Sequence, residues 1–184
     1  MKSPFKFLDS YTKEDREIFF GREKEIEELY HRLFESRILL VYGESGTGKS
    51  SLINCGLLNK LHDNEHLPLY IRRSDNILES LSEAINILLQ ESIPRQLLTA
   101  LLFKKALREI SDYTHKQLFF IFDQFEELFI FGSKEEKQSL IQVLKVLVES
   151  DVDCRSSLTG YSTLPFMMKN MIKTVRSLYC SQLA

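Results

Sequence analysis

The chain alternates between short runs in which nearly every residue is apolar and longer stretches in which apolar residues recur at helical spacing. The short runs predict three buried strands: residues 38–42 (ILLVY), a segment beginning at Leu67 (LPLYIRR), and residues 117–122 (QLFFIF). The third run is apolar on both faces, which is typical of a parallel sheet covered by helices on each side.

The longer stretches predict amphipathic helices. The first has its apolar residues three and four positions apart, at Ile26, Leu29, Tyr30, Leu33 and Phe34. Others are predicted from Lys49 to Leu57 or Leu58, over ILESLSEAINILLQ, over residues 95–110, and after a capping-box pattern at Ser133 and Glu136, with Leu140, Leu144 and Leu147 facing inward. Strands that alternate with helices form βαβ units, so we expect an α/β fold with three layers and a parallel sheet.

Composition narrows the class of protein. A length of 184 residues suits one domain, and 43% hydrophobic with 27% charged residues is ordinary for a globular protein. The net charge of −2 gives no field that would recruit nucleic acid or an anionic membrane. The start MKSPFKFLDS lacks the apolar stretch of a signal peptide, and the three cysteines have no metal-like spacing. We therefore expect a cytoplasmic protein without a membrane partner.

A glycine-rich octet directly follows the first predicted strand. It reads Gly43-Glu44-Ser45-Gly46-Thr47-Gly48-Lys49-Ser50, fits G-x-x-x-x-G-K-[ST], and continues through Ser51 into a predicted helix. Glycines allow a compressed loop whose N–H groups point inward, at a helix N-terminus that already favours anions. In such a phosphate loop, Lys49 reaches the terminal phosphates of a nucleotide and the Ser50 hydroxyl ligates Mg²⁺.

Acidic residues follow the third predicted strand. A carboxylate at the end of the Phe-rich run needs a partner, so we expect Asp123 to hold Mg²⁺ together with Ser50. If the chain turns helical there, Glu126 faces the same way and orients the attacking water. Glu127 competes for that role, and a solvated helix start is the alternative for both glutamates. The expected catalytic residues are thus Lys49, Asp123 and Glu126.

Two other ligand classes are less well supported. A guanine reader needs N-K-x-D, but Asn59-Lys60-Leu61 is followed by His62, so adenine is preferred over guanine. A small basic group on a predicted helix consists of Lys104, Lys105 and Arg108. It has no interleaved aromatic platform, so we interpret it as a solvated face and do not expect nucleic-acid binding.

Three segments together resemble the novel STAND branch of P-loop NTPases, which is related to AAA+ proteins. They are PFKFLDSYTKEDREIFFGREKEIEEL, the phosphate loop with its tail SSLINCGLL, and FIFDQFEELF. The resemblance implies an ATP-dependent signal-transduction switch that uses ATP, ADP and Mg²⁺, with Gly21 and Arg22 near the adenine. It also implies a protein partner, either an effector module or a longer related STAND protein.

The resemblance further implies a fourth strand, placed between the first and third, that ends in a residue reading the γ-phosphate. A central parallel strand should be almost continuously aliphatic, but within residues 154–160 only Cys154 and Leu158 are apolar. We therefore expect a sheet that is incomplete at its C-terminal end, with a core over residues 1–155 and a divergent tail over 156–184. Truncation or a frameshift after Arg155 is the leading hypothesis, and a short chain with a degenerate strand is the alternative.

These departures bear on activity. Closure of lid elements around the γ-phosphate is much of NTPase catalysis, so we expect nucleotide binding to persist better than ATP turnover. The alternative function is a non-catalytic nucleotide-binding or interaction module, a remnant of a larger STAND protein. Because the subunit contacts of STAND relatives usually need parts that this sequence lacks, we expect a monomer or weak self-association.

Overall fold

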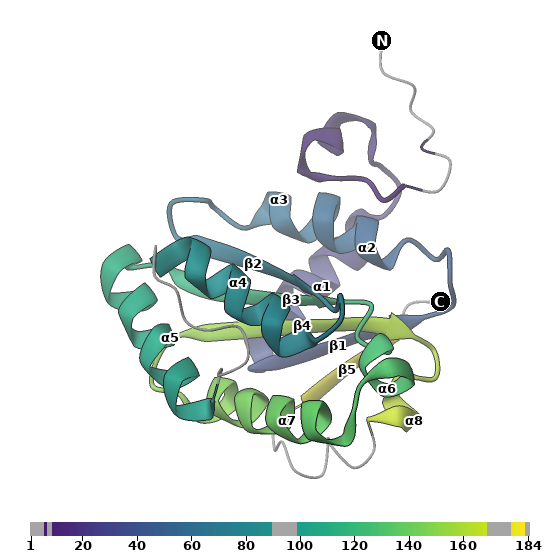
Figure 1. The fold of residues 1–184 in the computed structure, drawn as a ribbon. Coiled ribbons are helices and arrows are strands. Elements are labelled where there is room, and N and C mark those ends of the chain that lie inside the picture. Colours follow the sequence, from purple (N-terminus) through teal and green to yellow (C-terminus); the bar gives the residue numbers. More distant parts are fainter. Residues whose placement is uncertain (1–5, 7–8, 90–98, 169–177, 183–184) are drawn as a thin grey trace.

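A five-stranded parallel sheet forms the centre of the computed structural model, which describes residue 6 and residues 9–89, 99–168 and 178–182. The strand order is β2-β3-β4-β1-β5, and every neighbouring pair is parallel. The strands are β1 (Ile38–Gly43), β2 (His66–Arg72), β3 (Gln117–Asp123), β4 (Cys154–Tyr161) and β5 (Leu178–Gln182). Helices lie on both sides of the sheet (Figure 1), so the α/β class with three layers and a parallel sheet is confirmed.

Each face of the sheet has its own apolar cluster, because successive strand residues point to opposite faces. On one face Leu40 and Phe120 pack with α4 (Ile77–Leu89), α5 (Ala100–Thr114) and α7 (Lys134–Glu149). On the other face Leu39 and Phe119 pack with α1 (Glu23–Glu35) and with the helical segment after the phosphate loop. The predicted inward residues of α1 and α7 are buried there: Leu29, Leu33, Leu140, Leu144 and Leu147.

The helix predicted after the phosphate loop is built from three parts. These are α2 (Lys49–Ser51), the π-helical segment η2 (Leu52–Leu57) and α3 (Leu58–Lys60). A Cβ at Gly56 would lie 2.5 Å from Cγ1 of Ile26, so the glycine is what allows α1 to pack this closely. The remaining short helices are η1 (Lys13–Ile18), α6 (Glu127–Phe131) and α8 (Leu164–Met167).

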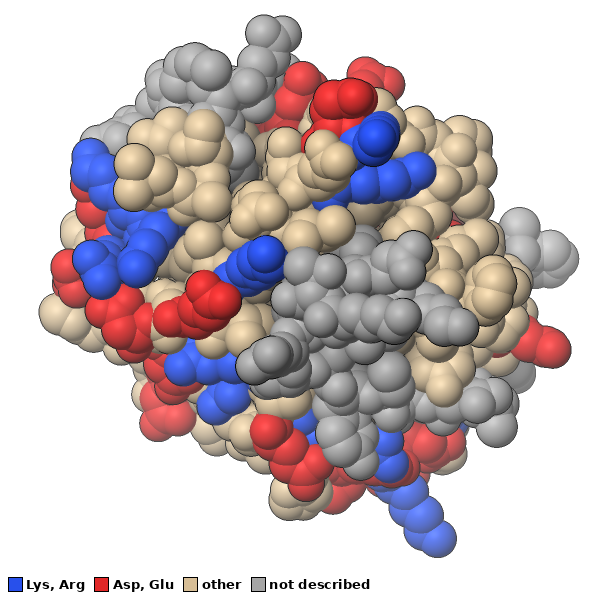
Figure 2. Space-filling model, turned by 90° about the horizontal axis from the view of Figure 1, so that it is seen from below, with Lys and Arg blue, Asp and Glu red and all other residues tan. Residues whose placement is uncertain are grey.

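The helix expected over residues 95–110 is observed as α5, which begins at Ala100. Thr99 caps it, because its hydroxyl accepts a hydrogen bond from the backbone N–H of Leu102 at 3.3 Å. Residues 95–98 of that prediction lie outside the described residues. Among the helices that the structure describes, none is long and apolar enough to cross a membrane. Figure 2 shows that blue and red side chains are interspersed over the face seen from below.

The expectation of a lost fourth strand is wrong. β4 lies in the middle of the sheet, with Leu158 opposite Leu40 of β1 and Phe122 of β3. Its polar residues Ser156, Ser157 and Thr159 are at most 2% exposed.

Two of these hydroxyls remain buried because they have backbone partners. The Ser156 hydroxyl donates to the carbonyl of Arg37 at 3.3 Å, and the Thr159 hydroxyl lies 3.2 Å from the carbonyl of Phe122. A buried hydroxyl is tolerated when it is hydrogen-bonded, so small polar residues can occupy a central strand. β5 also pairs with β1, so the sheet continues well beyond Arg155, which itself lies within β4.

Candidate functional site

The phosphate loop (residues 43–50) connects the end of β1 to α2, where a helix N-terminus faces the carboxyl edge of the sheet. Gly46 and Gly48 have φ values of +81° and +79°, a left-handed conformation that residues with a Cβ rarely adopt. Gly48 is also the N-cap of α2. The two glycines therefore give the loop the compressed shape that the sequence pattern predicts.

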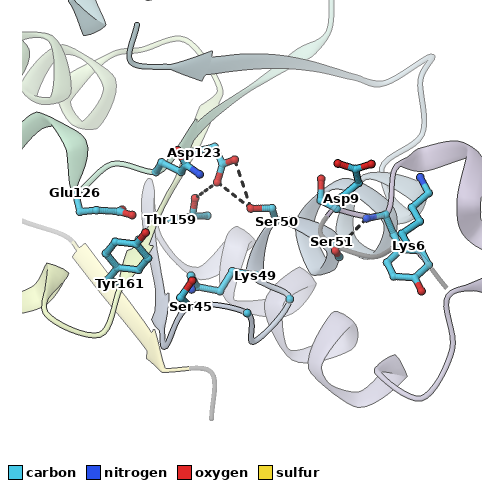
Figure 3. A pocket seen from close by; sticks show the side chains of 16 residues that line it. Lys6, Asp9, Ser45, Lys49, Ser50, Ser51, Asp123, Glu126, Thr159 and Tyr161 are labelled. Carbon is cyan, nitrogen blue, oxygen red and sulfur yellow. Dashed lines mark hydrogen bonds between the residues drawn. The ribbon is translucent and has the colours of Figure 1, made fainter.

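A cavity of about 400 Å³ lies over this loop and the ends of β3 and β4. Figure 3 shows Glu126 and Tyr161 at one end, Lys6 and Asp9 at the other, and Lys49, Ser50 and Asp123 between them. The full lining comprises Lys6, Asp9, Ser10, Tyr11, Ser45, Gly46, Gly48, Lys49, Ser50, Ser51, Asp123, Gln124, Glu126, Thr159, Gly160 and Tyr161. Segments far apart in the sequence thus form one continuous surface.

The Lys49 ammonium bonds to the loop itself. Its Nζ donates to the carbonyls of Gly43 at 3.1 Å and Glu44 at 2.7 Å, and it lies 5.8 Å from the centre of the Tyr161 ring. Burial lowers the pKa of Lys49, while the nearby carboxylates Glu126 and Asp123 oppose that shift. The ammonium is therefore held at the cavity by weak neutral acceptors that an anion could replace.

Ser50 and Asp123 meet across the cavity as the sequence predicts. The Ser50 hydroxyl donates to the Asp123 carboxylate, 3.1 Å from Oδ1 and 3.4 Å from Oδ2. The same Oδ1 accepts a hydrogen bond from Thr159 Oγ1 at 2.7 Å. A hydroxyl and a carboxylate at this spacing are the hard oxygen donors that Mg²⁺ prefers, so the residues fit this ion.

Glu126 also lines the cavity, three residues after Asp123. Its side chain is almost completely buried, at 2% exposure for the residue, and Oε2 has no hydrogen-bond partner among the described residues. Burial raises the pKa of Glu126, and a hydrogen bond from its own backbone and the charge of Lys49 only partly oppose that rise. Glu127, in contrast, does not line the cavity and lies 3.8 Å from the Arg72 guanidinium. The geometry therefore favours Glu126 over Glu127 as the residue beside a bound ligand.

The family follows from a match that spans most of the chain. The family model of novel STAND NTPase 1 matches residues 4–178. The chain belongs to the novel STAND NTPase 1 family. The match runs past Arg155, through all of β4 and to the first residue of β5, in agreement with a sheet that continues beyond Arg155.

This STAND domain is similar in sequence to one ATP-binding protein and in fold to several solved structures. An uncharacterized ATP-binding protein of Methanocaldococcus jannaschii is 34% identical over 76 residues, which are 40% of this chain and 21% of that protein. The ORC2 protein of Aeropyrum pernix, solved as ADPNP-ADP complexes, has a TM-score of 0.66 at 16% identity, covering 89% of this chain and 48% of its own. The Walker-type ATPase of Pyrococcus abyssi has a TM-score of 0.65 at 18% identity, covering 98% and 57%. These two likenesses show the P-loop ATPase fold, and the chain spans only part of each relative.

Gly21 and Arg22 do not line the cavity of this STAND domain. The Arg22 guanidinium donates to the carbonyl of Thr47 at 3.2 Å and forms an ion pair with Glu25 at 2.8 Å. Arg22 therefore supports the phosphate loop from its outer side. The wall of the cavity beside Ser51 is formed by the segment before η1, where the backbone N–H of Tyr11 donates to Ser51 Oγ at 3.0 Å.

Sequence reasoning missed Thr159, Gly160 and Tyr161 at the end of β4. The carboxyl ends of parallel strands meet at one edge of the sheet, and ligands of such folds bind there. Once residues 154–161 are recognised as a strand, their last three positions become site candidates on that rule alone. These three residues were therefore missed because β4 was not predicted as a strand.

Proposed function

We propose that this STAND domain binds Mg²⁺–ATP on its phosphate loop and acts as a nucleotide-dependent switch with slow ATP hydrolysis. One observation carries the proposal: Lys49 and Ser50 converge on a single cavity with Asp123 and Glu126, although the two pairs lie more than 70 positions apart in the sequence. Family membership and the P-loop ATPase fold support it.

Each residue has a role that its surroundings support. The loop N–H groups at Gly43, Glu44, Ser45, Gly46, Thr47 and Gly48 hold phosphate oxygens, together with Lys49 and the start of α2 at Ser50 and Ser51. Ser50 and Asp123 hold Mg²⁺, which neutralises phosphate charge when bound. Lys49 exchanges its two loop carbonyls for a phosphate, a stronger, charged acceptor.

Glu126 is proposed to orient the attacking water. Among the described residues its Oε2 has no hydrogen-bond partner, and a carboxyl whose pKa is raised by burial takes up a proton more readily at neutral pH than an ordinary one. ATP and ADP differ at the γ-phosphate, so the residues near that position can distinguish the two states. We place Glu126 there, at the start of α6, which makes α6 the first element that could move between them.

Thermal unfolding tests nucleotide binding directly. A ligand at a hundred times its Kd stabilises the folded state by about 2.7 kcal/mol, which for a chain of this size is roughly 5–11 °C in Tm. We expect this rise with Mg²⁺–ATP and with Mg²⁺–ADP. Lys49→Ala should lose it, and Lys105→Ala, a change at an exposed lysine on α5, should keep it.

The outcomes separate the proposed function from its alternative. A cooperative transition without any nucleotide shift would refute binding. A shift without phosphate release would support the non-catalytic nucleotide-binding or interaction module instead of the hydrolysing switch. The proposed protein partner is an effector module or a longer related STAND protein, and we expect the domain alone to be monomeric or weakly self-associating. A stable ATP-dependent ring in sedimentation would contradict that expectation.

A further inference from the structure

The end of β4 lies against Asp123 and Glu126, the two carboxylates to which the proposed function gives a role. We infer that Thr159 is a positioning residue for Asp123: its hydroxyl holds the carboxylate in the orientation that faces Ser50 and a bound Mg²⁺. The inference rests on the proposed function, because the use of Mg²⁺ belongs to that function. The inference gives a function to one of the polar residues of β4, the strand whose polar sequence suggested degeneration.

The hydrogen bonds of Thr159 define the direction of its single hydroxyl proton. Oγ1 lies 2.7 Å from Asp123 Oδ1 and 3.2 Å from the carbonyl of Phe122. Both are acceptors, and a hydroxyl has one proton, so it can donate fully to only one of them. The shorter, charge-assisted bond to the carboxylate takes the proton. Thr159 is 1% exposed, so its hydroxyl depends mainly on acceptors within the protein.

The backbone of Thr159 is fixed on both sides. It lies opposite Val41 of β1, and its carbonyl accepts a hydrogen bond of 2.7 Å from the N–H of Phe125, just after β3. The hydroxyl is therefore attached to a backbone position that is hydrogen-bonded on the β3 side and paired with β1 on the other. Ser50, the other hydroxyl on Asp123, belongs to the start of α2, which adjoins the phosphate loop, and its bonds are longer.

Gly160 complements this contact at the second carboxylate. A Cβ at Gly160 would lie 2.5 Å from Glu126 Oε2 and 2.5 Å from Leu164 Cδ2. The glycine therefore leaves the space that the Glu126 carboxyl occupies. Thr159 thus holds Asp123 by a hydrogen bond. The next residue, Gly160, makes room for Glu126 because it has no side chain.

The test compares ADP affinity with and without Mg²⁺, measured by titration calorimetry. Loss of a residue that orients a metal ligand typically weakens metal-dependent affinity by about 10–100-fold. We expect Thr159→Val, which has the same shape without the hydroxyl, to reduce the Mg²⁺-dependent gain in ADP affinity at least about tenfold. Affinity in EDTA should change little, and Thr159→Ser should restore most of the gain.

Ser157→Ala is the matched control, because Ser157 lies on the same face of the same strand and its buried hydroxyl has no partner among the described residues. It should keep the full Mg²⁺ effect. Thr159→Ala is a second hydroxyl-free variant, should the valine variant fail to fold.

Three results would overturn the inference. They are an undiminished Mg²⁺ effect in Thr159→Val, an equal loss in Thr159→Val and Ser157→Ala, and an equal loss with Mg²⁺ and with EDTA. If the unmodified chain binds no ADP under either condition, the proposed function itself fails. That result is distinct from the other three, because it does not depend on any variant.

Discussion

Replacing Glu126 by glutamine should make the free domain more stable. The Glu126 carboxyl is buried and its Oε2 has no hydrogen-bond partner among the described residues, so the ionised form has little compensation. Glutamine has nearly the same shape and carries no charge. The change therefore removes the free-energy cost of burying a negative charge, while the packing of α6 stays the same.

The size of the gain follows from the burial. An unsatisfied buried polar group costs about 1–3 kcal/mol, and more when it is charged. Glutamine still leaves a polar atom at the position of Oε2, so only part of that cost is recovered. We expect the free energy of unfolding to rise by about 1 kcal/mol, which corresponds to roughly 2–4 °C in Tm for a chain of this length.

The gain must depend on pH with a definite sign. Burial raises the pKa of Glu126 in the folded protein above its value in the unfolded chain, so the folded state binds more protons between the two values. The stability of the parent protein then falls as pH rises through this window. The advantage of Glu126→Gln should be absent below about pH 4, the ordinary range of a glutamate, and complete above the raised pKa.

Urea unfolding at a series of pH values measures this difference. Glu127→Gln is the matched control, because Glu127 is the next residue, its side chain is 26% exposed, and it lies near Arg72. Its effect should stay within about 0.5 kcal/mol at every pH. The reasoning would be refuted if Glu126→Gln were less stable than the parent at alkaline pH, or if its advantage did not change with pH.

Two further predictions concern stability. Glu136 is buried against Arg73, with 2.9 Å between Arg73 Nε and Glu136 Oε1. Glu136→Ala should cost about 3–5 kcal/mol in urea unfolding, because it removes the carboxylate from a largely buried ion pair and, among the described residues, leaves Arg73 with only the carbonyls of Ser74 and Asp75. A loss below about 1 kcal/mol would contradict this. The Lys6 ammonium, then the Thr12 backbone N–H, lower the pKa of Asp15 to about 2. Because that folded value lies below the ordinary 3.8, the stabilisation is present above about pH 4 and is lost as pH falls towards 2. The Tm difference between the parent and Asp15→Asn should therefore vanish over that range, and a constant difference would argue against the ion pair.

The parts of the fold that could be predicted from the sequence are those with a local signal. β1 and β3 are continuous apolar runs, and the phosphate loop needs glycines at fixed positions because of its left-handed backbone. The convergence of Ser50 and Asp123 was also predictable, because both follow parallel strands whose carboxyl ends meet. The strands and the phosphate loop are specified by a few adjacent residues, and the meeting of Ser50 and Asp123 then follows from the parallel arrangement of the strands.

The segment before η1, which forms one wall of the cavity, has no local sequence pattern that predicts this position. The backbone N–H of Tyr11 reaches Ser51, forty positions away, and the only local pattern there was the resemblance that placed the adenine near Gly21 and Arg22. Nothing in the spacing of polar and apolar residues indicates which part of an irregular segment turns toward a distant loop. Contacts of this kind depend on the assembled sheet and on the position of α2.

The sequence did not predict β4, because this strand carries polar residues and a glycine. The positions of those residues also indicate the role of the strand. Decay would leave polar residues and glycine anywhere along a strand, without regard to the site. Here the hydroxyl that bonds a carboxylate and the glycine that makes room for another are Thr159 and Gly160, at the carboxyl end, whereas Ser157, one step further from the site on the same face, has no partner for its hydroxyl among the described residues. Central parallel strands are usually aliphatic, and β4 departs from this rule at its carboxyl end, beside the cavity. The departure is therefore better explained by the needs of the site than by degeneration of the strand.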